Sequence, residues 1–243
     1  MERQGNIRIA SENMMPIIKK WLYSDKDIFL REIVSNASDA ITKYKKLVSL
    51  GEASEDERYQ IVVTTDDKAG TLTVEDNGIG MTEEEVEKYI TQIAFSGAAD
   101  FLEKYEKAGG EGIIGHFGLG FYSAYMVSDN IEIFTKSYRE GSKGVHWQSD
   151  GNSTYTIGEC DKQTRGTKVV MHLAEGEKEF ARESEVRKLL NKYCSFMPYE
   201  IFLNPKPEEE LNKDLKEGEE PKKNTPVNTT EPLYLKQPKD CTE

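Results

Sequence analysis

A carboxylate, an amide and a second carboxylate recur at helical spacing in the stretch IFLREIVSNASDAITKY. Glu32, Asn36 and Asp39 are four and three residues apart, so on an α-helix they lie along one edge of the apolar stripe that begins at Phe29. A half-shielded carboxylate suits a general base for water, and an amide oxygen one turn away suits a hard cation such as Mg²⁺. A solvated helix edge gives the same pattern, and this cluster alone favours that plainer interpretation.

A second cluster is the string EDNGIGM at residues 75–81, which follows an alternating apolar stretch and precedes a capped helix. Its glycines, Gly78 and Gly80, permit a tight turn with positive φ and a close approach of the backbone. Asp76 stands at the end of the expected strand, where a carboxylate can accept a hydrogen bond from an exocyclic amine. The same residue types are typical of any sharp turn, so the alternative is a connection without a ligand.

A third cluster is a run of glycines that leads directly into an expected helix. Gly112, Gly115, Gly118 and Gly120 are spaced three, three and two apart. Unpaired backbone N–H groups at a helix N-terminus bind anions, and phosphate is the most common ligand. No Gly-Lys-Ser/Thr follows and no βαβ series opens here, which excludes a Walker A loop and a dinucleotide-binding glycine pattern. A flexible hinge is the alternative.

The three clusters fit one ligand better than they fit three separate explanations. An acceptor for a base amine, a glycine loop for phosphates and a Glu/Asn helix edge for Mg²⁺ and water together describe a purine nucleoside triphosphate site. Lysines are scarce in all three strings, so backbone dipoles and the metal are expected to balance the phosphate charge.

The elements that must position these clusters follow from periodicity, caps and turn residues. Helical spacing predicts helices over residues 13–23, 27–50, 82–94, 121–127 and 178–194. Alternation predicts strands over residues 59–65, 71–75, 131–138, 144–149, 154–158, 167–173 and 199–203. Glycine and small residues over 95–120 are typical of a loop. Helices followed by strands in one unit predict an α+β two-layer sandwich, with helices packed on one face of a mostly antiparallel sheet.

Composition and charge narrow the function class. The chain has 32 Lys plus Arg and 44 Asp plus Glu, which gives a net charge of -12. This charge argues against a protein whose main function is to bind nucleic acid or an anionic membrane. No stretch approaches the roughly 20 apolar residues of a membrane span, and the N-terminus lacks the pattern of a secretory signal. The 3 cysteines have no CxxC spacing, so we expect free thiols in a reducing compartment.

Four strings come in the order and approximate spacing of the GHKL ATPases, a superfamily that includes gyrase, histidine kinases, mismatch-repair ATPases and the ninety-kilodalton heat-shock chaperones. They are EIVSNASDA at 32–40, DNGIGM at 76–81, GHFGLGFYSAY at 115–125 and RGTKV at 165–169. The longer strings YSDKDIFLREIVSNASDA and IGHFGLGFYSAYMV resemble the heat-shock chaperones specifically, and their bacterial members most of all. The similarity covers residues 6–204.

The resemblance implies a role for each matching residue. Glu32 would activate the attacking water, and Asn36 would coordinate Mg²⁺ and contact phosphate. Asp76 would bind the adenine amine, with Thr167 nearby. The other implied ATP/ADP contacts are Asp39 and Ala40 on the pocket wall, Gly80 and Met81 at the base, Tyr89 near the ribose, and the backbone N–H groups of Gly118, Leu119, Gly120 and Phe121 at the phosphates. Tyr89 and Phe95 depart from eukaryotic members, which carry asparagine and lysine there.

The resemblance also implies a domain organisation. Residues 1–204 would form the N-terminal nucleotide-binding domain, with a lid over about 83–115 that closes on ATP. Residues 205–228 are rich in Pro, Glu and Lys, and we expect a solvated charged linker there. Residues 229–243 resemble the start of the family's middle domain. That domain supplies the arginine that reaches the γ-phosphate, so we expect weak hydrolysis by this chain alone.

The function expected from the resemblance is that of an ATP-driven molecular chaperone. It would act on unfolded or partly folded client proteins in the cytoplasm, as a homodimer in its full-length form, with no nucleic-acid or membrane partner. One alternative is the ATPase domain of a DNA-acting GHKL protein in mismatch repair or DNA topology, which the acidic balance disfavours. Another is a ligand sensor without hydrolysis, which would not need Glu32.

Overall fold

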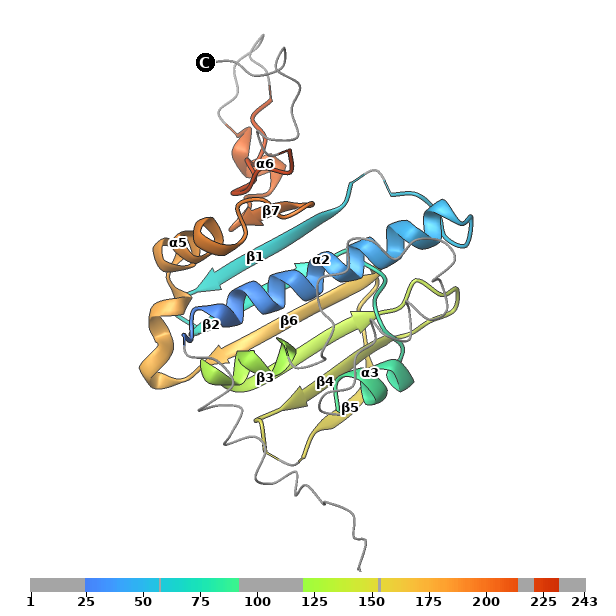
Figure 1. Ribbon diagram of the computed structural model, residues 1–243, viewed down its shortest axis with the longest axis horizontal. Helices are drawn as coiled ribbons and strands as arrows, with labels where there is room; N and C mark the ends of the chain where they lie inside the picture. Colours follow the sequence, from blue (N-terminus) through green and yellow to red (C-terminus); the bar gives the residue numbers. More distant parts are fainter. Residues whose placement is uncertain (1–24, 57, 92–119, 153, 214–220, 232–243) are drawn as a thin grey trace, which may run out of the picture.

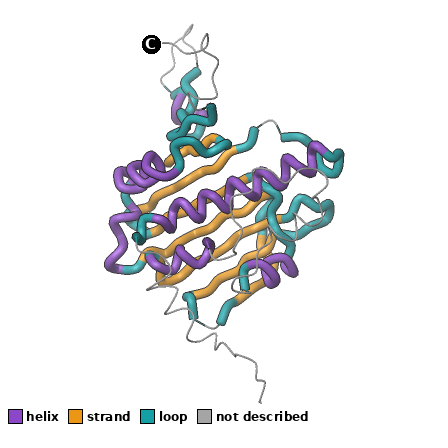
Figure 2. The backbone as a smooth tube through the Cα atoms, viewed as in Figure 1, coloured by secondary structure: helices purple, strands orange, loops and turns teal. Residues whose placement is uncertain are grey.

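The computed structural model describes residues 25–56, 58–91, 120–152, 154–213 and 221–231. A seven-stranded sheet in the order β5-β4-β3-β6-β2-β1-β7 forms one layer, and the helices lie over one of its faces (Figures 1 and 2). The expected α+β two-layer sandwich is confirmed. The elements are α2 (Ile28–Ser49), β1 (Gln60–Asp66), β2 (Thr71–Asp76), α3 (Glu83–Tyr89), the 3₁₀ helix η2 (Gly120–Met126), β3 (Ser128–Lys136), β4 (Gly144–Ser149), β5 (Thr156–Cys160), β6 (Gly166–Leu173), the 3₁₀ helix η3 (Glu175–Ala181), α5 (Glu183–Tyr193), β7 (Glu200–Leu203) and α6 (Glu208–Leu211).

The strand pairing is antiparallel throughout the described sheet except between β1 and β7, which run parallel. Its register places three polar residues on neighbouring strands. Asp76 at the end of β2 pairs with Thr167 of β6, and Thr167 pairs in turn with Thr135 of β3. Side chains of directly paired residues point to the same face of a sheet. All three therefore belong to the face that the helices cover.

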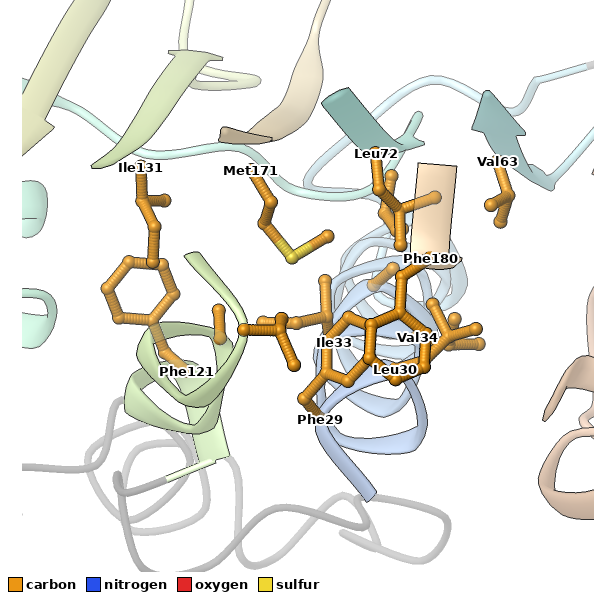
Figure 3. Close-up of a cluster of buried hydrophobic side chains, with 14 of the residues drawn as sticks. Phe29, Leu30, Ile33, Val34, Val63, Leu72, Phe121, Ile131, Met171 and Phe180 are labelled. Atoms are coloured by element: carbon orange, nitrogen blue, oxygen red, sulfur yellow. The ribbon is translucent and has the colours of Figure 1, made fainter. Parts of the chain in front are cut away.

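Helix α2 supplies most of the helical side of the core. Its side chains at helical spacing, from Phe29 to Leu47, are buried in one stripe. Figure 3 shows Phe29, Leu30, Ile33 and Val34 beneath strand residues that include Leu72 and Met171. The Phe29 ring also meets Phe180 edge to face, with ring centroids 5.1 Å apart. Burial of this stripe fixes the rotation of α2 about its axis, and therefore which of its residues lie beside the core and can be reached by a ligand.

Several boundaries differ from the sequence expectation. The expected helix over 178–194 is broken at Arg182, whose backbone is extended (φ -93, ψ 131). On one continuous helix Phe180 and Val186 would lie about 120° apart; in the structure both are buried, Phe180 on η3 against Phe29 and Val186 on α5. Helix α3 ends at Tyr89, and β5 begins at Thr156, two residues late. The expected helix over 13–23 lies outside the described residues.

The end of the segment expected to be a solvated linker packs against the sheet. The Val227 N–H donates to the Ile201 carbonyl at 2.8 Å. The Asn228 side chain accepts from the Ile201 N–H at 2.8 Å and donates to the carbonyls of Met197 and Tyr199 at 3.0 and 2.9 Å. Asn228 is 9% exposed. Local composition misses this contact because the partners lie in β7 and the turn before it.

In the part of the chain that the structure describes, no helix combines the length and the apolar character of a membrane span.

We expect Asn228→Ala to lower the free energy of unfolding by about 1–3 kcal/mol, because it leaves the buried Ile201 N–H without its acceptor. Asn224→Ala is the matched control, since Asn224 makes the same two-way pair with the Lys206 backbone in an exposed setting. Urea denaturation of both variants measures the difference. Equal losses would contradict the role assigned to burial.

Candidate functional site

A buried carboxylate stands at the end of β2. Asp76 is 6% exposed, and its Oδ1 accepts a hydrogen bond from the Gly78 N–H at 2.7 Å. Burial raises the pKa of Asp76 to about 7, although N–H groups of Gly78 and Thr167 and the charge of Lys162 lower it. The neighbouring Glu75 raises it further. A carboxylate has about four lone-pair sites, so it can still accept a hydrogen bond from a ligand.

The turn after Asp76 is docked on α2 and on β3 through two glycines. The Ile79 N–H donates to the Ala40 carbonyl at 2.9 Å. A Cβ added to Gly78 would come within 2.4 Å of the Ala40 carbonyl carbon. Gly80 has φ +63, and a Cβ there would lie 1.8 Å from the Lys136 carbonyl oxygen. The close backbone approach expected from the sequence is therefore confirmed at both positions.

A buried threonine links the turn to β6. The Met81 N–H donates to Thr135 Oγ1 at 3.0 Å, and Thr135 Oγ1 lies 2.9 Å from Thr167 Oγ1. Thr135 is fully buried. Thr135 was not among the predicted site residues, although a hydroxyl stands in the inward-facing series Ile131, Ile133 and Thr135, where an apolar side chain is the usual choice. That break in the pattern is the signal that was available.

The first half of α2 approaches the last glycine of the third cluster. A Cβ added to Gly120 would come within 2.8 Å of Glu32 Oε2, so the two residues are in contact. Glu32 Oε1 accepts from the Arg31 guanidinium, with Nη2 at 2.5 Å. The Glu32 side chain is 21% exposed. The candidate base and the last glycine of the run thus lie together, as the single-ligand hypothesis requires.

The remaining α2 residues divide by exposure. Asn36 is exposed, whereas Asp39 is 5% exposed. Lys43, one turn after Asp39, has its pKa lowered by burial, against the raising effect of the carboxylates of Asp39 and Glu85. Asn36 thus offers an accessible amide oxygen on this edge, whereas Asp39 is buried.

Helix α2 joins the two halves of the site. Ala40 touches the turn after Asp76, and Glu32 touches Gly120. These α2 residues are eight positions apart, or about 12 Å along the axis. The turn after Asp76 and Gly120 therefore lie against two points of the same helix.

The other predicted residues lie on η2, on α3 or outside the described part. Phe121 is 8% exposed and meets Trp147 with ring centroids 5.8 Å apart. Tyr89 ends α3, with the Lys88 ammonium 5.1 Å from its ring centroid. Gly118 and Leu119, and the part of the expected lid beyond residue 91, lie outside the described residues. Their roles stay predictions.

The chain is similar in sequence to known ATPases and chaperones. Residues 24–182 match the family described as histidine kinase-, DNA gyrase B- and HSP90-like ATPase. Over 241 residues the chain is 49% identical to the chaperone protein HtpG of Porphyromonas gingivalis and to that of Bacteroides fragilis, covering 99% of this chain and 34% of each relative. It is 41% identical over 197 residues to the mitochondrial 75 kDa heat shock protein of Bos taurus, covering 80% of this chain and 28% of that protein. The chain spans about a third of the length of these curated relatives.

The raised pKa of Asp76 predicts a pH-dependent stability. Because the folded pKa of about 7 exceeds the ordinary 3.8, the free energy of unfolding falls as pH rises from about 4 to about 7 and stays lower above that. Asp76→Asn removes this loss, and we expect it to stabilise the ligand-free protein at pH 8 by on the order of 2–4 kcal/mol, with little gain at pH 4.

Denaturation midpoints at the two pH values measure the effect. Asp129→Asn, on the exposed start of β3, is the control and should change neither. An Asp76→Asn protein that is less stable than the parent at pH 8 would show that burial of the charge is not costly here.

Proposed function

Because the chain belongs to the histidine kinase-, DNA gyrase B- and HSP90-like ATPase family, we propose that it is the ATP-binding and ATP-hydrolysing domain of a molecular chaperone. The observation that carries the proposal is the buried Asp76 carboxylate on a glycine turn, joined through α2 to Glu32 and Gly120. The relatives' names, chaperone protein and heat shock protein, support this function over a DNA-acting ATPase.

The adenine end of the site would be the Asp76 end. An ionised carboxylate accepts a hydrogen bond from the exocyclic amine of adenine, and a buried one rejects a ligand that presents a carbonyl oxygen in its place. Thr167, one strand away, would complete the base contacts. Gly80 and Met81 would line the base pocket, because Thr135 holds the Met81 N–H and Gly80 lies against Lys136.

The phosphate end would be the Gly120 end. Gly120 and Phe121 begin η2, and with Gly118 and Leu119 they would present backbone N–H groups to the phosphates. Asn36 is exposed on the edge of α2, one turn after Glu32, and would offer Mg²⁺ an oxygen. Mg²⁺ commonly takes one or two protein oxygens together with phosphates and waters, so this donor set fits. When bound, the metal supplies charge neutralisation at the phosphates.

Hydrolysis would use the Glu32 carboxylate. Arg31 binds Oε1, whereas Oε2 lies against Gly120, beside the proposed phosphate site. A carboxylate within hydrogen-bond reach of a water there can accept its proton as the water attacks the terminal phosphorus, while the bond from that phosphorus to the bridging oxygen breaks and ADP leaves. Ala40 and Asp39 would act as wall residues, and Tyr89 would lie near the ribose.

The chaperone cycle is proposed for the full-length protein. Residues 1–204 would be the nucleotide-binding domain, 205–228 a charged linker and 229–243 the start of a middle domain. ATP would favour closure of a lid over about 83–115 and association of two such domains, because it binds the closed state more tightly. Clients would be unfolded or partly folded proteins in the cytoplasm, without nucleic-acid or membrane partners.

We expect Glu32→Ala to retain ATP binding and to lose at least about 100-fold in turnover, since it removes a general base but no binding contact. Calorimetry measures the affinity, and phosphate release by the full-length protein measures turnover. Glu185→Ala, which removes a carboxylate paired with Lys188 at the surface of α5, is the control. Hydrolysis at the parent rate by Glu32→Ala would show that the base is misassigned.

We expect Asp76→Asn to abolish ADP binding in calorimetry, because a carboxamide cannot replace the charge that accepts the adenine amine. The variant's folded state is verified by circular dichroism. An affinity for ADP equal to that of the parent would remove Asp76 from the adenine site.

A further inference from the structure

Arg165, in the loop before β6, joins four segments of the chain. Its guanidinium Nη1 donates to the carbonyls of Asn77 and Gly78, the latter at 2.5 Å. Its Nη2 pairs with the Asp56 carboxylate in the loop before β1. The guanidinium carbon lies 3.4 Å from the ring centroid of Tyr44 on α2. The Arg165 side chain is 16% exposed, so these contacts are largely shielded from water.

The first carbonyl belongs to the peptide plane that orients Asp76. In a trans peptide the C=O of one residue and the N–H of the next point in opposite directions. The Asn77 carbonyl points to Arg165, and the Gly78 N–H on the other side of the same plane donates to Asp76 Oδ1 at 2.7 Å. The guanidinium therefore determines where that N–H points.

The second carbonyl belongs to the plane that docks the turn on α2. The Gly78 carbonyl accepts from Arg165, and the Ile79 N–H opposite it donates to the Ala40 carbonyl at 2.9 Å. One guanidinium thus fixes the orientation of two consecutive peptide planes. One of them aims a donor at the Asp76 carboxylate, and the other holds the turn against α2.

We propose that Arg165 is a positioning residue for adenine recognition, which acts by holding the Asn77–Gly78 and Gly78–Ile79 peptide planes behind Asp76. The inference rests on the proposed role of Asp76 in binding the adenine amine. Arg165 does not touch the base; it keeps the carboxylate pointing at it.

The chemistry of the guanidinium suits this role better than that of an ammonium. Its planar fork binds two carbonyls and a carboxylate at once while its face stacks on Tyr44. A lysine at this position would reach one of these partners at a time and would not stack. Arg165→Lys therefore retains the positive charge but removes the planar arrangement of donors, so it tests whether that arrangement is needed.

The test compares the affinity of the full chain for ADP and for inosine diphosphate, which carries an oxygen in place of the adenine amine. The quantity measured is the ratio of the two affinities in calorimetry. We expect Arg165→Ala to lower this ratio by about tenfold, the effect of one lost hydrogen bond to a charged group. Arg165→Lys should fall between that variant and the parent.

Arg58→Ala is the matched control, because the Arg58 guanidinium also lies over an aromatic ring, Phe202, and pairs with a carboxylate, that of Glu200. We expect it to leave the ratio unchanged. Asp56→Asn weakens the ion pair that helps to position the Arg165 guanidinium. It should lower the affinity ratio by less than Arg165→Ala does. If Arg165→Ala does not fold, Arg165→Lys and Asp56→Asn decide the question.

The possible outcomes separate this inference from the proposed function. A parent protein that binds neither nucleotide, or binds both equally, would overturn the proposed adenine site itself. A parent that prefers ADP, with the preference unchanged in the folded Arg165 variants, would overturn the positioning role alone. Equal weakening of both nucleotides in the variants would indicate a merely structural contribution and would also overturn it.

Discussion

Burial of one carboxylate is the constraint on which this end of the molecule depends. Water stabilises an ionised Asp far better than a protein interior does, and at Asp76 the exclusion of water outweighs the nearby N–H donors and Lys162. The fold tolerates this cost because the surrounding turn is held on several sides, by Ala40, Thr135 and Arg165. A ligand that presents an N–H donor to the carboxylate would recover part of that lost solvation.

Helix α2 gives the site its length. Its apolar stripe is buried over the sheet, so its orientation is set by core packing rather than by the ligand. The edge beside that stripe carries Glu32, Asn36 and Asp39. Contacts at two points of α2, Ala40 with the turn and Glu32 with Gly120, place the proposed base end and the proposed phosphate end on the same helix. A site built on a helix holds its geometry better than one built on loops alone.

Local patterns in the sequence were sufficient to predict much of the fold and part of the candidate site. The apolar period of α2, the glycines at positions 78 and 80 and the location of Asp76 at a strand end all depend on residues close together in the chain. The contacts that complete the site do not. Thr135 meets Met81 across 54 residues, and Arg165 meets Gly78 across 87. Such pairings follow from sheet register and loop packing, which periodicity does not encode. The docking of Asn228 was missed for the same reason, because its partners lie in β7 and the turn before it.

The central claim is that a single nucleotide spans the edge of α2 from Asp76 to Gly120, and NMR titration tests it most directly. Adenosine should shift the amide resonances of Gly78 and Ile79 and leave those of Gly120 and Phe121 in place, whereas ADP with Mg²⁺ should shift both pairs. If ADP with Mg²⁺ moved only one of the pairs, or if adenosine acted at the Gly120 end, the two halves would not belong to one nucleotide site.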